Sequence, residues 1–220
     1  MGCLTMFKKK IISTAVLTLI GVGGVSSTVH ATISADRQSG ETNTIVGFAS
    51  DNTEVDPKDG ELGITKIPSA FDFGRENQVS STIQTVSATN AGTQYVTATD
   101  LRTSKTTWSV TAQASELVNI LDTTDKISAA TIQISGHATT NNGSSWVSTN
   151  DVAVNTVNLN AGGDSATFIS TTAADTSSLP EQEVGAQIRT VNLNLAANQG
   201  SSEQQYTGFI TWNLESVPTP

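Results

Sequence analysis

The sequence is poor in the residues that carry most metal and nucleophile chemistry. It has one cysteine, Cys3, and two histidines, His30 and His137, among 220 residues. Charged residues make up 14% of the chain and aromatic residues 5%. So few thiols and imidazoles exclude the ligand sets of zinc peptidases. The chain is rich instead in Thr, Ser, Asn, Ala and Val, a composition that favours β-strands over helices held by charge pairs.

The first 31 residues have the organisation of a secretory signal peptide. Lys8 to Lys10 form a cationic start, the stretch from Ile11 to Val25 is apolar, and Val29 to Ala31 has the small residues of a cleavage site. The apolar run is short, contains glycines and is followed by polar sequence, unlike a membrane-spanning helix. We therefore expect export, cleavage after Ala31, and no membrane span in the mature chain.

Cleavage would change the composition and the net charge of the chain. It would remove Cys3, His30 and three lysines, leaving 8 basic against 20 acidic residues and a formal charge of −12. A mature chain without cysteine has no disulfides, as is common among proteins exported to the exterior of Gram-positive cells. Nucleic acid is excluded as a partner, because binding to phosphates needs clustered Lys and Arg, and here the basic residues are scattered.

The rest of the chain has the pattern of an all-β domain. Residues 32–43 are polar and patternless, which predicts a flexible leader. From residue 44, short alternating stretches recur between turn residues, at 44–50, 61–67, 79–86, 94–101, 106–114, 130–136, 152–160, 165–170, 188–196 and 206–214. We predict a β-sandwich of about nine to ten short, mostly antiparallel strands in one domain at residues 44–220.

An acidic, turn-rich stretch lies early in this domain. Asp51, Glu54, Asp56 and Asp59 could chelate calcium, but Val55 occupies the fifth position of an EF-hand loop and no Glu follows at the twelfth. We predict a solvated loop and no metal site or cofactor. Whether residues 51–59 bind calcium stays open.

The pentapeptide TVNLN occurs twice, at residues 156–160 and 190–194. The sequences around the two copies are not similar. We interpret them as two strands of similar chemistry and not as a repeat unit.

Two Trp-x-aliphatic triplets lie about a hundred residues apart. Residues two apart on a strand share a face, so Trp108 shares its face with Val110, and Trp212 shares its face with Leu214. Both triplets are apolar on one side and polar on the other. We therefore predict that these four side chains are structural and face the core, with the two tryptophans close together.

Three ordered motifs resemble one known family. They are GELGITKIPSAFDFG at residues 60–74, VTATDLRTSKTTWSV at 96–110 and YTGFITWNL at 206–214. In this order and behind a signal peptide, they resemble the WxL-domain surface proteins of Gram-positive bacteria, specifically the small single-domain members. The first triplet departs from the family pattern, because Val110 stands where Leu is usual.

The resemblance implies a secreted protein that binds the cell wall non-covalently, with peptidoglycan as its ligand. It also implies a cell-surface complex with a membrane-anchored WxL-interacting protein and other WxL proteins. The chain shows no LPxTG sortase motif, since SLPEQE near Leu179 does not match it. Which wall component is bound, and the oligomeric state, stay open.

Two other classes of function are alternatives to direct binding. Catalysis is not expected, although a glycosidase using only carboxylates is not formally excluded. The alternative is a structural or adhesive subunit located at the wall through a membrane-anchored partner. The acidic charge favours it, because walls rich in teichoic acid are polyanionic and repel such a chain at low salt.

If the triplets are buried, wall contact needs other side chains. Trp146 lies in TTNNGSSWVSTND, a stretch typical of an exposed loop, with the amides of Asn142 and Asn150 near it. Aromatic rings stack on apolar sugar faces, and amides bond sugar hydroxyls. These three residues are the predicted ligand contacts. In the alternative interpretation, Trp146 folds back as an anchor on its own sheet.

Overall fold

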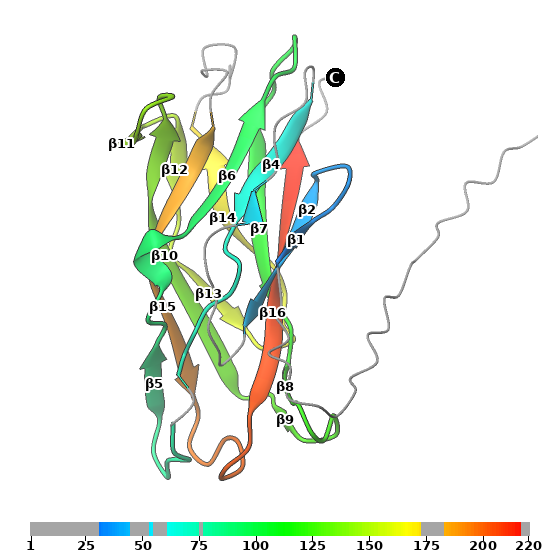
Figure 1. Ribbon diagram of the computed structural model, residues 1–220, viewed down its shortest axis with the longest axis vertical. Coiled ribbons are helices and arrows are strands. Elements are labelled where there is room, and N and C mark those ends of the chain that lie inside the picture. Colours follow the sequence, from blue (N-terminus) through cyan, green and yellow to red (C-terminus); the bar gives the residue numbers. More distant parts are fainter. Residues whose placement is uncertain (1–30, 45–52, 55–60, 75–76, 173–182, 217–220) are drawn as a thin grey trace, which may run out of the picture.

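The structure is a computed structural model that describes residues 31–44, 53–54, 61–74, 77–172 and 183–216 (Figure 1). Its described residues form two sheets of eight strands each, and every strand pairing is antiparallel. The predicted all-β sandwich is confirmed. The sixteen described strands exceed the nine or ten expected, because several very short strands pair with parts of the long ones.

Sheet A has the order β1-β2-β16-β7-β14-β12, and β8 and β9 extend it at one end of β16. The second and the last strands of the described chain, β2 and β16, lie side by side in this sheet. The strand bounds are β1 Thr32–Ile33, β2 Ser39–Thr44, β7 Trp108–Ala114, β8 Leu117–Asn119, β9 Lys126–Ile127, β12 Val152–Val154, β14 Ala166–Thr171 and β16 Tyr206–Ser216.

Sheet B has the order β11-β10-β15-β6-β4-β3, with β13 also paired to β10 and β5 also paired to β15. Its longest strands, β10 and β15, run together along the molecule, with β11 near one end and β5 near the other (Figure 1). The bounds are β3 Thr53–Glu54, β4 Leu62–Ile67, β5 Gln84–Ser87, β6 Tyr95–Asp100, β10 Ala130–Asn141, β11 Trp146–Ser148, β13 Val157–Asn160 and β15 Val184–Leu195.

The core lies between the two sheets and is built by alternation. In β6, Val96 and Ala98 are fully buried in it, while Tyr95 and Thr97 point to the opposite side of the sheet. In β16, Ile210 and Trp212 are fully buried in the same cluster. We call the side of each sheet that faces away from this cluster its outer face.

The predicted flexible leader at residues 32–43 is wrong, because this segment forms β1 and β2. It binds both sheets: the N–H of Leu214 donates to the Gln38 carbonyl at 2.7 Å, and the N–H of Ile64 donates to the Arg37 carbonyl at 2.8 Å. The Arg37 side chain is 1% exposed, and its Nη2 donates to Glu61 Oε2 at 2.6 Å. Backbone and polar contacts hold this segment, so its sequence shows no apolar alternation.

Two further expectations concern segments near β3. The strand expected at residues 44–50 lies outside the described residues apart from Thr44, which ends β2. The acidic stretch at 51–59 also lies outside them, except for the two residues of β3.

Candidate functional site

The two triplets lie next to each other on paired strands. In the register of β7 and β16, Val110 is opposite Leu214, Trp212 is opposite Ala112 and Trp108 is opposite Ser216. All these positions share one face, the core face of sheet A. The two indoles are four positions apart, about 13 Å along the strands, and therefore flank the aliphatic pair without stacking.

All four triplet side chains are buried. Trp212 and Val110 are 0% exposed, Trp108 is 2% exposed and Leu214 is 6% exposed. The Trp212 ring also packs against Phe168 of β14, with ring centroids 5.6 Å apart. A ligand as large as a wall polymer cannot reach side chains this deep, so a binding site must use other residues.

The two indole N–H groups differ in their surroundings. Trp212 Nε1 donates to Thr42 Oγ1 at 2.8 Å, and Thr42 Oγ1 donates in turn to the Pro68 carbonyl at 2.6 Å. Trp108 Nε1 is buried and has no hydrogen-bond partner in the described part of the chain. The second triplet thus ties β16 to β2 through a polar contact, and the first relies on packing.

Trp146 lies on the outer face of sheet B. It begins β11, opposite Asn141 of β10, and its ring stacks on Tyr95 of β6 with centroids 4.5 Å apart and planes at 24°. Both side chains are half-buried. Strands β10 and β15 lie between β11 and β6, so the two rings meet across them. We call Trp146 and Tyr95, with Lys66 and Glu183 beside them, the aromatic platform.

On the outer face of sheet B, the position of β15 nearest the aromatic platform is a glycine, Gly185. Gly185 of β15 is paired with Thr139 of β10 on one side and Thr97 of β6 on the other. A Cβ atom at Gly185 would lie 2.1 Å from the Val96 carbonyl oxygen, a distance that no side chain tolerates. Only glycine fits this close approach of β15 to β6.

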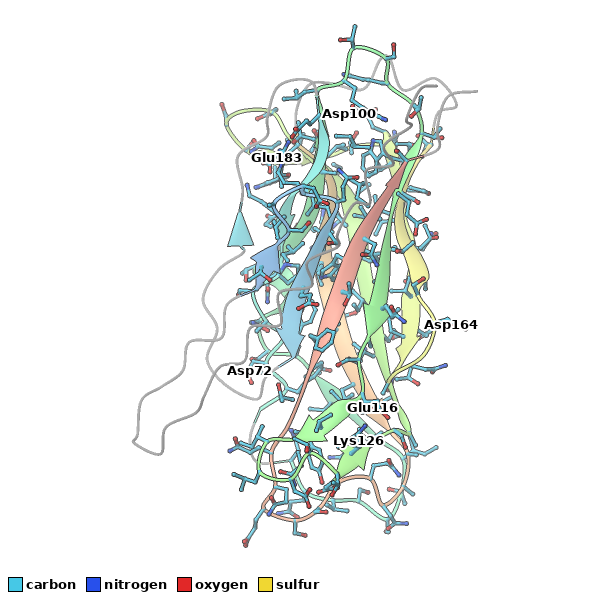
Figure 2. All side chains as sticks on the ribbon, turned by 90° about the vertical axis from the view of Figure 1, so that its right-hand side faces the viewer. Asp72, Asp100, Glu116, Lys126, Asp164 and Glu183 are labelled. Carbon is cyan, nitrogen blue, oxygen red and sulfur yellow. The ribbon has the colours of Figure 1, made fainter. Side chains whose placement is uncertain are left out.

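Charged and polar groups fix the platform in place. Lys66 Nζ lies 5.0 Å from the centroid of the Trp146 ring, within cation–π range, and 3.1 Å from Glu183 Oε2. Glu183 also accepts hydrogen bonds from Thr97 Oγ1 at 3.3 Å and Asn141 Nδ2 at 3.4 Å. Figure 2 shows Glu183 near the same end of the sandwich as Asp100. The aromatic pair is therefore preorganised by four strands.

The structure does not gather the three predicted ligand contacts. Asn142 lies in the turn before β11, where its Oδ1 accepts hydrogen bonds from the N–H groups of Ser144 and Ser145. Asn150 is exposed beyond the other end of β11, where its carbonyl accepts a hydrogen bond from Thr172. Trp146 packs back on its own sheet, as in the alternative interpretation. Its contact with a ligand stays a prediction.

Sequence reasoning missed the partners of Trp146. Successive residues of β6 point to opposite faces of the sheet. Because Val96 is buried in the core, Tyr95 points to the outer face. No local signal connects Tyr95, Lys66 and Glu183 to Trp146, because their proximity depends on the order of four strands.

The only pair of basic side chains in hydrogen-bond contact among the described residues lies farther along the same face. Arg189 Nε donates to His137 Nδ1 at 2.8 Å. Burial, and then the positive charge of Arg189, lower the pKa of His137 below its usual value of 6.5. Within the described ranges no group of three or more His, Cys, Asp or Glu residues could hold a metal ion, and no helix is long and apolar enough to cross a membrane.

Comparison with known families agrees with this architecture. The family model described as WxL domain, surface cell wall-binding, matches residues 35–218. No curated protein and no solved structure matches the chain. The matched range covers nearly the whole chain, from just before β2 to beyond the second triplet, and the chain therefore belongs to the WxL-domain family of surface cell wall-binding proteins.

Proposed function

We propose that this protein binds the peptidoglycan of a Gram-positive cell wall directly and non-covalently, through the aromatic platform on the outer face of sheet B. The observation that carries the proposal is the stacked pair of Trp146 and Tyr95, held half-exposed on a rigid sheet. The triplets are buried and cannot supply the contact. Aromatic rings stack on apolar sugar faces, and Lys66 and Glu183 place polar groups beside them.

The charge of the protein sets the kind of contact. A mature chain near −12 is repelled by a polyanionic wall, so binding must come from short-range stacking and hydrogen bonds. Added salt screens the repulsion. Binding is therefore expected to change little or to strengthen as salt is raised.

The test is retention of the purified protein on peptidoglycan stripped of teichoic acid, with no partner present, at low and high salt. We expect Trp146→Ala to weaken binding about tenfold, the loss expected for one stacked aromatic contact. Phe209→Ala is the matched control, because Phe209 is a 41% exposed aromatic residue on the outer face of the other sheet. Binding that collapses with salt, or that Trp146→Ala leaves unchanged, would remove the platform from the site.

The acidic charge also favours a second function, that of a structural or adhesive subunit. In that case a membrane-anchored WxL-interacting protein, together with other WxL proteins, locates this chain in a surface complex. The same assay separates the two functions. A subunit of this kind is not retained on bare peptidoglycan but is retained once the partner is added.

We infer no catalytic role, since the family is described by binding. Incubation with purified cell wall should release no soluble sugar or peptide. Release of reducing sugar that is lost in a carboxylate variant would instead indicate a glycosidase.

A further inference from the structure

The two TVNLN copies lie on either side of one strand. Strand β10 pairs with β13, which holds residues 157–160 of the first copy, and with β15, which holds the second copy. Thr131 of β10 is opposite both Asn160 and Asn194, and Gln133 is opposite both Asn158 and Asn192. The two copies therefore stand in the same register across β10, which the sequence alone does not show.

The alternation of the pentapeptide gives this part of the sheet two different faces. Leu159 and Val191 are buried in the core, and Leu193 packs against it. The four asparagines consequently point to the outer face. Strand β5 continues the pattern, with Thr85 opposite Asn194 and Ser87 opposite Asn192. We name the resulting two rows the amide ladder: Asn160, Thr131, Asn194 and Thr85 in one row, and Asn158, Gln133, Asn192 and Ser87 in the other.

In the hydrogen bonds within the ladder, the side-chain oxygens of the four asparagines are acceptors, and their Nδ2 groups are not donors. The side-chain Oδ1 of Asn194 accepts from Thr85 at 2.7 Å, and that of Asn192 accepts from Ser87 at 2.8 Å. Asn160 Oδ1 accepts from Thr131 and Asn158 Oδ1 accepts from Gln133, both at 3.0 Å. None of the four Nδ2 groups donates to another group in the described part of the chain. The ladder thus presents four oriented amide donors.

The spacing of the ladder suits an extended polymer that carries hydroxyl and acetamido groups at regular intervals. Asparagines two apart on one strand are about 6.7 Å apart, and β13 and β15 lie about 9.6 Å apart across β10. The eight side chains thus form a grid of two rows across four strands. All eight side chains are uncharged, on a protein whose mature charge is expected to be −12, so the ladder itself adds no repulsion to an approaching acidic wall.

The ladder and the aromatic platform lie on the same outer face of sheet B. Strands β10 and β15 run from one to the other, with β11 near one end and β5 near the other (Figure 1), and the His137 and Arg189 pair lies between them. A chain-like ligand lying along these two strands would contact the rings at one end and the amide donors at the other.

We propose that the amide ladder binds N-acetylated glycan strands, with the Asn158, Asn160, Asn192 and Asn194 amides donating to the acetamido carbonyl and hydroxyl oxygens of successive sugars. The inference rests on the proposed function, because it takes wall glycan as the ligand. Single hydrogen bonds to a solvated sugar are weak, and a regular row of donors makes the affinity depend on strand length.

The experiment measures retention on three probes: peptidoglycan stripped of teichoic acid, its glycan strands freed of stem peptides, and the same strands after chemical removal of the N-acetyl groups. The variant N192D/N194D preserves side-chain shape and the acceptor oxygens but replaces donors with acceptors. The variant N192T/N194T removes the amides without adding charge. The charge-matched control is Q113E/N213D, on the outer face of sheet A. Thermal unfolding is recorded for each variant to show that it is folded.

We expect N192D/N194D to bind peptide-free glycan at least tenfold more weakly, N192T/N194T to bind it several-fold more weakly, and the control to stay within twofold of wild type. At a salt concentration that screens the charge of the exposed amines, wild type should bind de-N-acetylated strands less well. If wild type and Trp146→Ala differ while both ladder variants bind as wild type, the ladder is overturned and the proposed function stands. If wild type binds no peptidoglycan, both are overturned. Ladder variants that change only self-association would also overturn the proposal, since this face would then meet a second copy.

Discussion

The core face of sheet A and the outer face of sheet B both carry tryptophan, in opposite roles. On the first, Trp108 and Trp212 belong to sequence motifs and are buried. On the second, Trp146 belongs to neither triplet and is half-buried on Tyr95. The tryptophans of the two triplets therefore build the fold, whereas the surface that we propose to meet the wall uses a tryptophan that lies outside both triplets.

The strongest test of this contrast is Trp212→Ala. It removes a fully buried side chain that packs on Phe168 and bonds Thr42, so we expect a loss of about 3–5 kcal/mol in the free energy of unfolding. Trp146→Ala should cost much less, because its ring is half-buried. Urea unfolding of both variants gives the comparison. A Trp212→Ala protein that kept wild-type stability but lost wall binding would reverse the two roles.

Gly185, on the outer face of sheet B, offers the next test. Gly185→Ala places a Cβ atom against the Val96 carbonyl, and the resulting separation of β6 and β15 should cost about 1–3 kcal/mol. It should also move Tyr95 away from Trp146 and weaken wall binding. Gly92→Ala is the control, because a Cβ there meets nothing within 4 Å. Equal stability of the two variants would show that the close approach is not required.

Much of this fold is predictable where apolar alternation is complete. Strands β4, β6, β7 and β16 lie within a residue or two of their expected positions. Strand β2 was missed because its core-side positions are Gly40 and Thr42, which carry no apolar signal although both are buried. Strand β10 extends beyond its predicted end at Gly136, because its core-side residues from there on are Gly136, Ala138 and Thr140, which give little apolar signal.

The candidate site was less predictable than the fold. The sequence marks Trp146 as an aromatic residue in polar surroundings and shows two TVNLN copies. Strand order determines that Tyr95 stacks on Trp146 and that both copies flank β10. Strand order is a long-range property, and no local pattern of residues contains it.

On the core face of sheet A, comparing Trp212→Phe with Trp108→Phe separates what the two indole N–H groups contribute to stability. Trp212→Phe loses the hydrogen bond to Thr42, whereas Trp108→Phe removes an N–H group that has no partner in the described residues. We expect Trp212→Phe to be the more destabilising by about 1–2 kcal/mol. Thermal and urea unfolding of the two variants measure this difference. Equal losses would mean that packing alone, and not the Thr42 contact, distinguishes the triplets.

The smallest expected effect is a pH dependence of the free energy of unfolding, caused by His137 on the outer face of sheet B. Burial and Arg189 lower the pKa of His137, so below about pH 6.5 the unfolded chain binds a proton that the native protein does not. The free energy of unfolding should therefore fall slightly as pH drops below 6.5 and level off once the native pKa is passed. His137→Gln should remove this step in urea unfolding between pH 7.5 and 5.5. A separate loss is expected at lower pH, because hydrogen bonds, first that from the Tyr206 hydroxyl, lower the pKa of Asp125 and stabilise the fold only while that carboxylate is ionised. If His137→Gln kept the step near pH 6.5, the titrating group would have to lie elsewhere in the protein.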